Sequence, residues 1–136
     1  MDLNREPSAI AHAAAEEIRA LNHRTLDNSV FSQPVQVSDT AFGVSTSLER
    51  LPQALEQLKG ALTQLQADGR IRLAPKPLRE TSQQDINTEV TTAVLALSDA
   101  QDFLRQAHNA MRNATNVLSN LGGLWEDSEE MAAEGI

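Results

Sequence analysis

The chain has 136 residues, no cysteine, 3% aromatic residues and a formal net charge of -8. A chain of this length can fold as one domain without a disulfide or a metal, and the absence of thiols excludes disulfide frameworks, thiolate nucleophiles and cysteine-ligated zinc. The scarcity of aromatic side chains predicts an aliphatic core between helices, and the acidic balance argues against general attraction to nucleic acid.

The sequence carries no pattern typical of export or membrane insertion. No basic flank precedes an apolar run near the start, and no stretch of eighteen residues is wholly apolar. Signal peptides need the first pattern and transmembrane helices need the second. We therefore expect no membrane contact and a cytoplasmic location.

A first helix is expected over about residues 8–27, with Ser8 as its N-cap. Its apolar residues recur at spacings of three and four but form only a thin stripe, so this helix needs a partner. Residues 28–38 combine β-branched residues with Pro34 and are expected to form an extended connector.

A second helix is expected over residues 39–67, capped by Ser38 or Asp39 and ended by Gly69. Pro52 lies within it and predicts a kink or a short break, because proline lacks the N–H and clashes with the preceding turn. The apolar residues alternate at spacings of four and three, which is the pattern of a coiled-coil seam. This seam consists of Val44, Leu48, Leu51, Leu55, Leu58, Leu62 and Leu65.

A third helix is expected over residues 82–121, capped by Thr81 or Ser82 and ended by the Gly122-Gly123 pair. Its seam has the same spacing and alternates large with small side chains. The large members are Val90, Leu97, Leu104, Met111 and Leu118, and the small ones are Ala93, Ala100, Ala107 and Ala114. Alanine at every seventh position predicts that a neighbouring helix approaches closely.

These elements predict an all-α fold, an antiparallel three-helix, coiled-coil-like bundle with one long C-terminal helix. The bundle is expected over residues 1–121 and an acidic tail over residues 122–136. The two long seams are expected to pack against each other, joined by a loop long enough to reverse direction.

No residue pattern predicts catalysis or a cofactor. The histidines His12, His23 and His108 are not at metal-ligand spacing, and the sequence has no Glu-x-x-His pair. It also has no Gly-x-Ser-x-Gly elbow and no phosphate-binding glycine loop. We therefore expect neither an enzyme nor a metal or cofactor site.

Charge is segregated between the loop and the tail. The loop over residues 70–79 contains four basic residues, Arg70, Arg72, Lys76 and Arg79, whereas the tail contains five acidic residues and no base. An antiparallel dimer of the long helices would bring each loop near the tail of the other copy. A solvated loop and a solvated tail are the equally open alternative.

Two further features are candidates for partner contact. Four asparagines, Asn109, Asn113, Asn116 and Asn120, recur at spacings of four and three, although asparagine is a poor helix former. They form either a hydrogen-bonding contact surface or an ordinary solvated face. Trp125 is the sole tryptophan, and it either anchors a contact or covers the end of the bundle.

The stretches AAEEIRALNHRTLD, LERLPQALEQL and GRIRL resemble small uncharacterised all-helical proteins of actinomycetes. The resemblance covers about half of the chain and implies no activity. The WXG100 proteins are also helical hairpins, but this chain lacks their Trp-x-Gly turn and has no tyrosine for their C-terminal motif.

The sequence therefore predicts a non-catalytic helical protein–protein interaction module, an adaptor or assembly subunit that associates with itself. The alternative is a nucleic-acid-associated regulator in which the basic loop contacts phosphate and the acidic tail competes for the loop.

Overall fold

The computed structural model describes residues 1–124, which contain helices, turns and loops but no strand. Three α-helices follow in order, α1 (Pro7–Arg24), α2 (Pro34–Ala67) and α3 (Gln83–Leu118). Short 3-10 helices, η1 (Asn28–Val30) and η2 (Leu78–Glu80), lie in the two connections. The predicted all-α fold is confirmed, whereas Trp125 and most of the predicted acidic tail lie outside the described residues.

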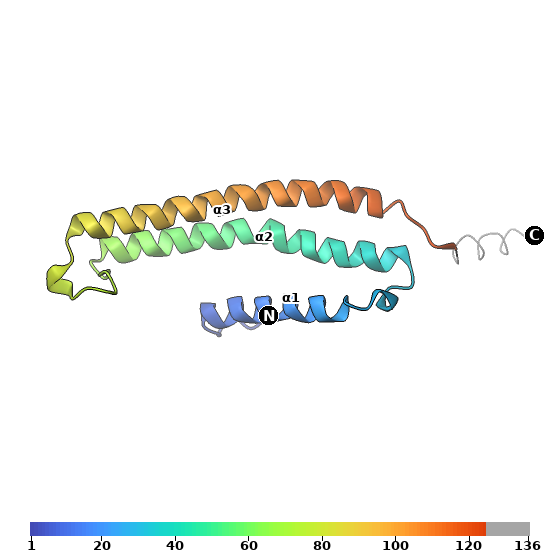
Figure 1. Cartoon of the computed structure of the whole chain (residues 1–136), viewed down its shortest axis with the longest axis horizontal. Coiled ribbons are helices and arrows are strands. Elements are labelled where there is room, and N and C mark those ends of the chain that lie inside the picture. Colours follow the sequence, from blue (N-terminus) through green and yellow to red (C-terminus); the bar gives the residue numbers. More distant parts are fainter. Residues whose placement is uncertain (125–136) are drawn as a thin grey trace, which may run out of the picture.

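The long helices α2 and α3 form an antiparallel hairpin, and α1 lies beside α2 on the side away from α3 (Figure 1). The 36 residues of α3 form one uninterrupted helix, which spans about 54 Å at ~1.5 Å per residue. Every residue of α1 except Leu21 is exposed. The third helix of the predicted bundle is therefore present, but it adds little to the core of the hairpin.

Prolines set the starts of α1 and α2. Pro7 and Pro34 lie in the first helical turn, where backbone N–H groups have no partner within the helix. The N–H that proline lacks therefore costs no hydrogen bond there, and its fixed φ suits a helix. As a result α1 starts before Ser8, and α2 starts before residue 39. The predicted extended connector up to residue 38 is therefore wrong in its last residues. Gln36 supports the early start, because its Oε1 accepts the backbone N–H of Gln33 at 3.2 Å.

The other helix ends follow local chemistry. Gly69 ends α2 with a φ of 68°, and the N–H of Arg70 donates to the carbonyl of Leu65 at 3.0 Å, as in a Schellman motif. Ser82 caps α3 by accepting the N–H of Asp85 at 3.1 Å. These two caps confirm the sequence prediction. The expected end of α3 at residue 121 is wrong, because the chain turns after Leu118.

The helix α2 continues through Pro52 without a break. Pro52 is buried, and its carbonyl accepts a hydrogen bond from α3. Of the predicted kink or short break, the short break is therefore wrong, because the proline removes one backbone hydrogen bond without ending the helix.

Gly60 within α2 and Gly69 just beyond its end should respond in opposite ways to alanine. A Cβ added at Gly60 meets no atom within 4 Å, so Gly60→Ala is expected to stabilise the fold by about 1 kcal/mol through helix propensity. Gly69→Ala should destabilise it by about 1–2 kcal/mol, because the left-handed φ of 68° strains any residue with a Cβ. Urea unfolding followed by circular dichroism measures both, and equal effects of the same sign would contradict this account.

Candidate interaction surface

Apart from Ile86 and Val90 near the loop, the latter a seam residue, the buried residues of α2 and α3 lie one position along from the predicted seams. On α2 they are Ser38, Ser45 and Pro52, at intervals of seven. On α3 they include Gln101 and Thr115, which also stand a multiple of seven apart. We call these positions the contact line. Ser45, Pro52, Gln101 and Thr115 each follow directly after a seam residue. Both helices are therefore turned so that the seams point to one side of the hairpin.

The alanine row is correspondingly displaced from the helix contact. Ala93, Ala100 and Ala107 are half-buried, and Ala114 is exposed. The prediction that these alanines draw the two helices together is therefore wrong, although α2 and α3 do pack as a pair.

Gln101 is the centre of the contact line and is only 2% exposed. Its Nε2 donates to the carbonyl of Pro52 at 2.8 Å and to Glu56 Oε2 at 2.9 Å. The same Glu56 oxygen lies 2.8 Å from Lys59 Nζ, which also donates to Ser98 Oγ at 3.0 Å. This network joins the middle of α2 to the middle of α3 and satisfies the buried amide.

The register set by Pro52 and Gln101 persists along the hairpin. Two heptads nearer the loop, Gln66 Nε2 donates to Asn87 Oδ1. Two heptads in the other direction, the same register places Ser38 level with Thr115, and both are buried. A line of mostly polar residues thus runs along the hairpin contact, beside half-buried Leu48, Leu55 and Leu62 of α2. Sequence reasoning missed this line because it followed only apolar spacing.

The rotation leaves an apolar face on one side of the hairpin. Three of its leucines remain largely accessible, since Leu51 is 43%, Leu58 is 55% and Leu65 is 42% exposed, and Phe103 on α3 is 67% exposed. We define the apolar face as Val44, Leu48, Leu51, Leu55, Leu58, Leu62 and Leu65 of α2 with Ala93, Ala96, Leu97, Ala100, Phe103, Leu104, Ala107, Met111 and Ala114 of α3.

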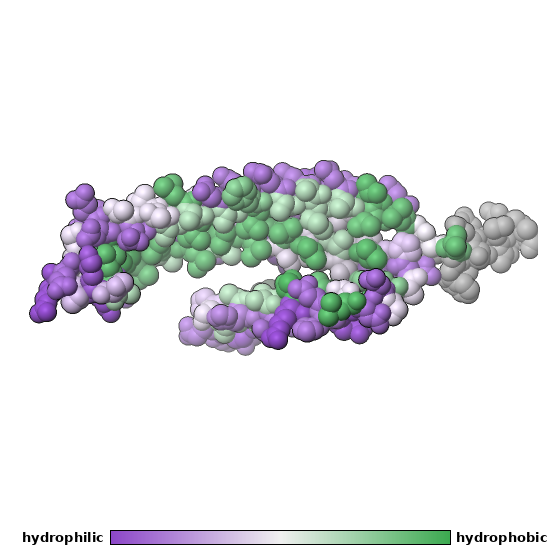
Figure 2. Space-filling model, viewed as in Figure 1, coloured by the Kyte–Doolittle hydropathy of each residue, from purple (hydrophilic) through white to green (hydrophobic). Residues whose placement is uncertain are grey.

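The apolar face contains no charged residue. Between its first and last positions every acidic and basic residue of the two helices falls, by helical spacing, in the helix contact, on the opposite side or on an outer edge. These residues are Glu49, Arg50, Glu56, Lys59, Asp99, Asp102, Arg105 and Arg112. Figure 2 shows the result as a continuous hydrophobic band over α2 and α3, with hydrophilic residues gathered along the outer edge of α3 and at the loop.

The helix α1 borders this face without covering it. A groove of about 570 Å³ separates α1 from α2, with Ala14 and Ile18 on one wall and Leu51 and Ala54 on the other. In Figure 2 the hydrophobic band remains open above α1. The contact of α1 with the hairpin is therefore loose and confined to one edge of α2.

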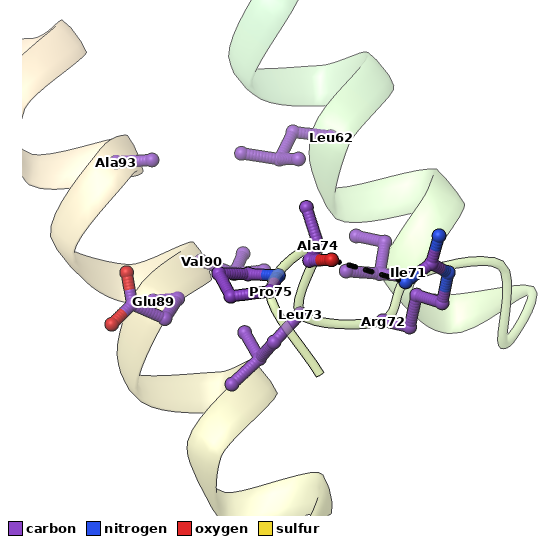
Figure 3. Close-up of a pocket in the computed structure, with 9 residues that line it drawn as sticks. All are labelled: Leu62, Ile71, Arg72, Leu73, Ala74, Pro75, Glu89, Val90 and Ala93. Carbon is purple, nitrogen blue, oxygen red and sulfur yellow. Dashed lines mark hydrogen bonds between the residues drawn. The ribbon is translucent and has the colours of Figure 1, made fainter. Parts of the chain in front are cut away.

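The basic loop folds back over the end of the apolar face. Leu73 and Pro75 of the loop, with Leu62 and Ala93 of the two helices, line a pocket of about 390 Å³ (Figure 3). Arg72 is used within the loop, because its Nη1 donates to the carbonyls of Ala74 at 3.4 Å and Lys76 at 3.2 Å. Arg70, Lys76 and Arg79 are exposed to solvent.

The predicted asparagine stripe is brought together only in part. Asn109, Asn113 and Asn116 lie on the exposed surface of α3 and line one shallow depression with Arg112. Asn120 lies beyond the end of α3, in the turn where its N–H donates to the carbonyl of Val117 at 3.0 Å. The stripe and the basic loop stand at opposite ends of α3, and Trp125 lies outside the described residues.

Over residues 1–124, no group of three His, Asp or Glu side chains is placed to hold a metal ion. Within the same range, none of the helices is both long enough and apolar enough to cross a membrane. Comparison of the chain with family models, with curated proteins and with solved structures finds no match.

Replacing Gln101 should weaken the hairpin. Gln101→Ala removes both hydrogen bonds and leaves a cavity in the contact line, so we expect a loss of about 1–3 kcal/mol in the free energy of unfolding. Gln106→Ala, at an exposed position of α3, is the control and should change the stability by less than about 0.5 kcal/mol. Urea unfolding distinguishes the two, and similar values for both would show that the network does not hold the hairpin.

The network also predicts how stability responds to acid. Hydrogen bonds from Lys59 and Gln101, with the charge of Lys59, hold the pKa of Glu56 below its ordinary value of 4.5. A lowered folded-state pKa stabilises the fold above pH 4.5, and this stabilisation is lost as the pH falls through the folded-state value. From pH 7 to pH 3, the urea midpoint of Glu56→Gln should therefore fall less than that of the unaltered chain. An identical fall in both would contradict a role for this carboxylate.

Proposed function

We propose that this chain is a helical protein–protein interaction module, an adaptor or assembly subunit that binds through the apolar face of the α2/α3 hairpin. The observation that carries the proposal is an uncharged apolar face that runs over both long helices and that α1 leaves open. Exposed apolar surface of this extent marks interaction sites in folded proteins.

The shape of the face favours a helical partner. It is long, follows the heptad spacing of two helices and has a leucine ridge beside a row of alanines, which together form a groove that accepts apolar side chains at helical spacing. The two cavities that border the apolar face, beside the loop and beside α1, are lined mainly by aliphatic side chains, a setting that suits packing better than chemistry.

The nucleic-acid alternative has less support. Of the four loop cations, Arg72 donates to carbonyls within the loop, and Asp68, Glu80 and Asp85 lie close in sequence to the other three. Phosphate binding depends on an excess of positive charge, and this end of the hairpin is close to neutral.

A matched pair of leucine variants tests the proposal. Leu58 lies on the apolar face and Leu95 lies on the outer edge of α3, and the two are 55% and 60% exposed. Leu58→Glu places a charge on the face, whereas Leu95→Glu adds the same charge elsewhere at similar cost to the hairpin.

Each variant and the unaltered chain would be used as bait in extracts of the native host, with captured proteins quantified by mass spectrometry. We expect the Leu58→Glu bait to capture some proteins in amounts at least about tenfold lower than both the unaltered chain and Leu95→Glu do. A tenfold loss corresponds to about 1.4 kcal/mol of binding free energy. Capture of the same proteins in the same amounts by all three baits would refute the proposed role of the face.

A further inference from the structure

We infer that the apolar face is closed by a second copy of this chain, so that two hairpins form a four-helix bundle in which α2 of each copy packs on α3 of the other. This inference rests on the proposed function, because it names the partner of the same face.

The seams point where a four-helix bundle needs them. In a two-stranded coiled coil the seam of each helix faces the other helix, whereas in a four-helix bundle it points to the axis between all four. In this hairpin the neighbouring positions, Ser45, Pro52 and Gln101, mediate the contact, and both seams point to the same side. The hairpin thus has the geometry of one half of a four-helix bundle.

The core of the single chain is thin for its length. Over residues 1–124, only Ile86 and Val90 are buried hydrophobic residues, at 3% and 7% exposed. A domain of this size ordinarily buries far more apolar surface to offset the entropy of folding. Closing the apolar face would bury Leu51, Leu58 and Leu65 and supply the missing core.

Charge and area both permit a second copy. The chain carries a net charge of -8, so a charged face would repel itself, but this face is neutral and can be apposed to its own copy without that cost. The face runs over 22 residues of each helix, so two helices about 10 Å wide and about 33 Å long present about 660 Å². Standard interfaces bury about 600–1,000 Å² on each partner, and the face lies within that range.

The helix α1 is not placed to be the occupant. Its 18 residues span about 27 Å, against about 33 Å for the face, but they lie along one edge of α2 and not over the face. It borders α2 near Ser47 and Ala54, and the half of the face around Leu58 and Leu65 lies beyond these positions. A second hairpin matches the full length.

The shape of the apolar face determines how the two copies stack. The α2 half is a ridge of leucines and the α3 half is a row of alanines, so stacking α2 on α3 of the other copy fits large side chains against small ones. Stacking α2 on α2 would instead oppose two ridges and leave the alanine rows apart.

This arrangement places the two loops at the same end of the dimer, because its two-fold axis runs along the helices. Arg70, Lys76 and Arg79 of the two copies would share that end. Asp68 and Glu80 flank these cations in the same region, so the repulsion between loops is small.

Light scattering and sedimentation equilibrium of the full chain test the dimer. We expect a mass of twice the 14.8 kDa of one chain at micromolar concentration. Leu58→Glu should weaken the dimer by at least about 100-fold, since each dimer buries two added charges, and Leu95→Glu should leave it unchanged. Circular dichroism of both variants is the control that checks whether they remain helical.

Spin labelling tests the arrangement, and the absence of native cysteine makes a single label specific. Lys76→Cys labels the exposed loop. Loops at one end should give a distance between labels below about 35 Å, whereas loops at opposite ends would give about 50 Å or more, the length of the hairpin. The longer distance would overturn the proposed stacking.

The outcomes separate this inference from the proposed function. A monomer at about 100 µM, or equal weakening by Leu58→Glu and Leu95→Glu, would overturn the dimer through this face. If Leu58→Glu still lost captured proteins in that case, the face would bind another helical protein and the proposed function would stand. A dimer combined with unchanged capture would leave self-association as the only role of the face.

Discussion

The hydrogen bonds of Gln101 fix how α2 and α3 are turned about their own axes. A buried amide must be paired, and Gln101 finds its partners at the carbonyl of Pro52 and at Glu56. Neither partner lies on the leucine ridge. If the two seams met directly, the amide would be carried away from both partners. The polar contact line therefore takes the centre of the hairpin, and the leucines are left to one side.

Because the polar contacts take the centre of the hairpin, the chain buries less apolar surface, but the register of α2 against α3 is defined. Polar contacts such as those of Gln101 with Pro52 and of Gln66 with Asn87 are directional and specify which residues stand level. The leucine ridge alone would allow the helices to slide by a heptad, because each of its turns resembles the next. The same choice leaves apolar surface accessible, and it is this surface that suits a partner.

The sequence was sufficient to predict the elements whose signals are local and repeated. The long α3 followed from an unbroken seam, and the ends at Gly69 and Ser82 followed from cap chemistry that needs only a few neighbours. The start of α2 was missed because Pro34 was interpreted as a connector residue, when the first turn of a helix accommodates proline equally well.

The sequence predicts which apolar residues form the face, but not the direction in which they point. Heptad spacing identifies the apolar stripe of each helix, but the rotation of one helix against the other depends on Gln101 meeting Pro52, a contact across 49 residues. A weak signal existed, since Ser38, Ser45, Pro52 and Lys59 recur at intervals of seven beside the leucines. A polar line flanking an apolar seam favours a hairpin contact through the polar line, and it leaves the seam free for further helices.

The close passage of Gly123 over the start of α2 has a consequence for the segment that follows. Gly123 is buried, and a Cβ at this position would lie 1.8 Å from Gln33 Oε1, so any larger residue would have to displace the Gln33 side chain. This passage tethers the chain at the end of the hairpin opposite the loop. In a dimer with both loops at one end, the two acidic sequences after residue 124 would begin together at the other end. Any ligand of these sequences would then meet two copies at once, with the gain in avidity that a raised effective concentration brings.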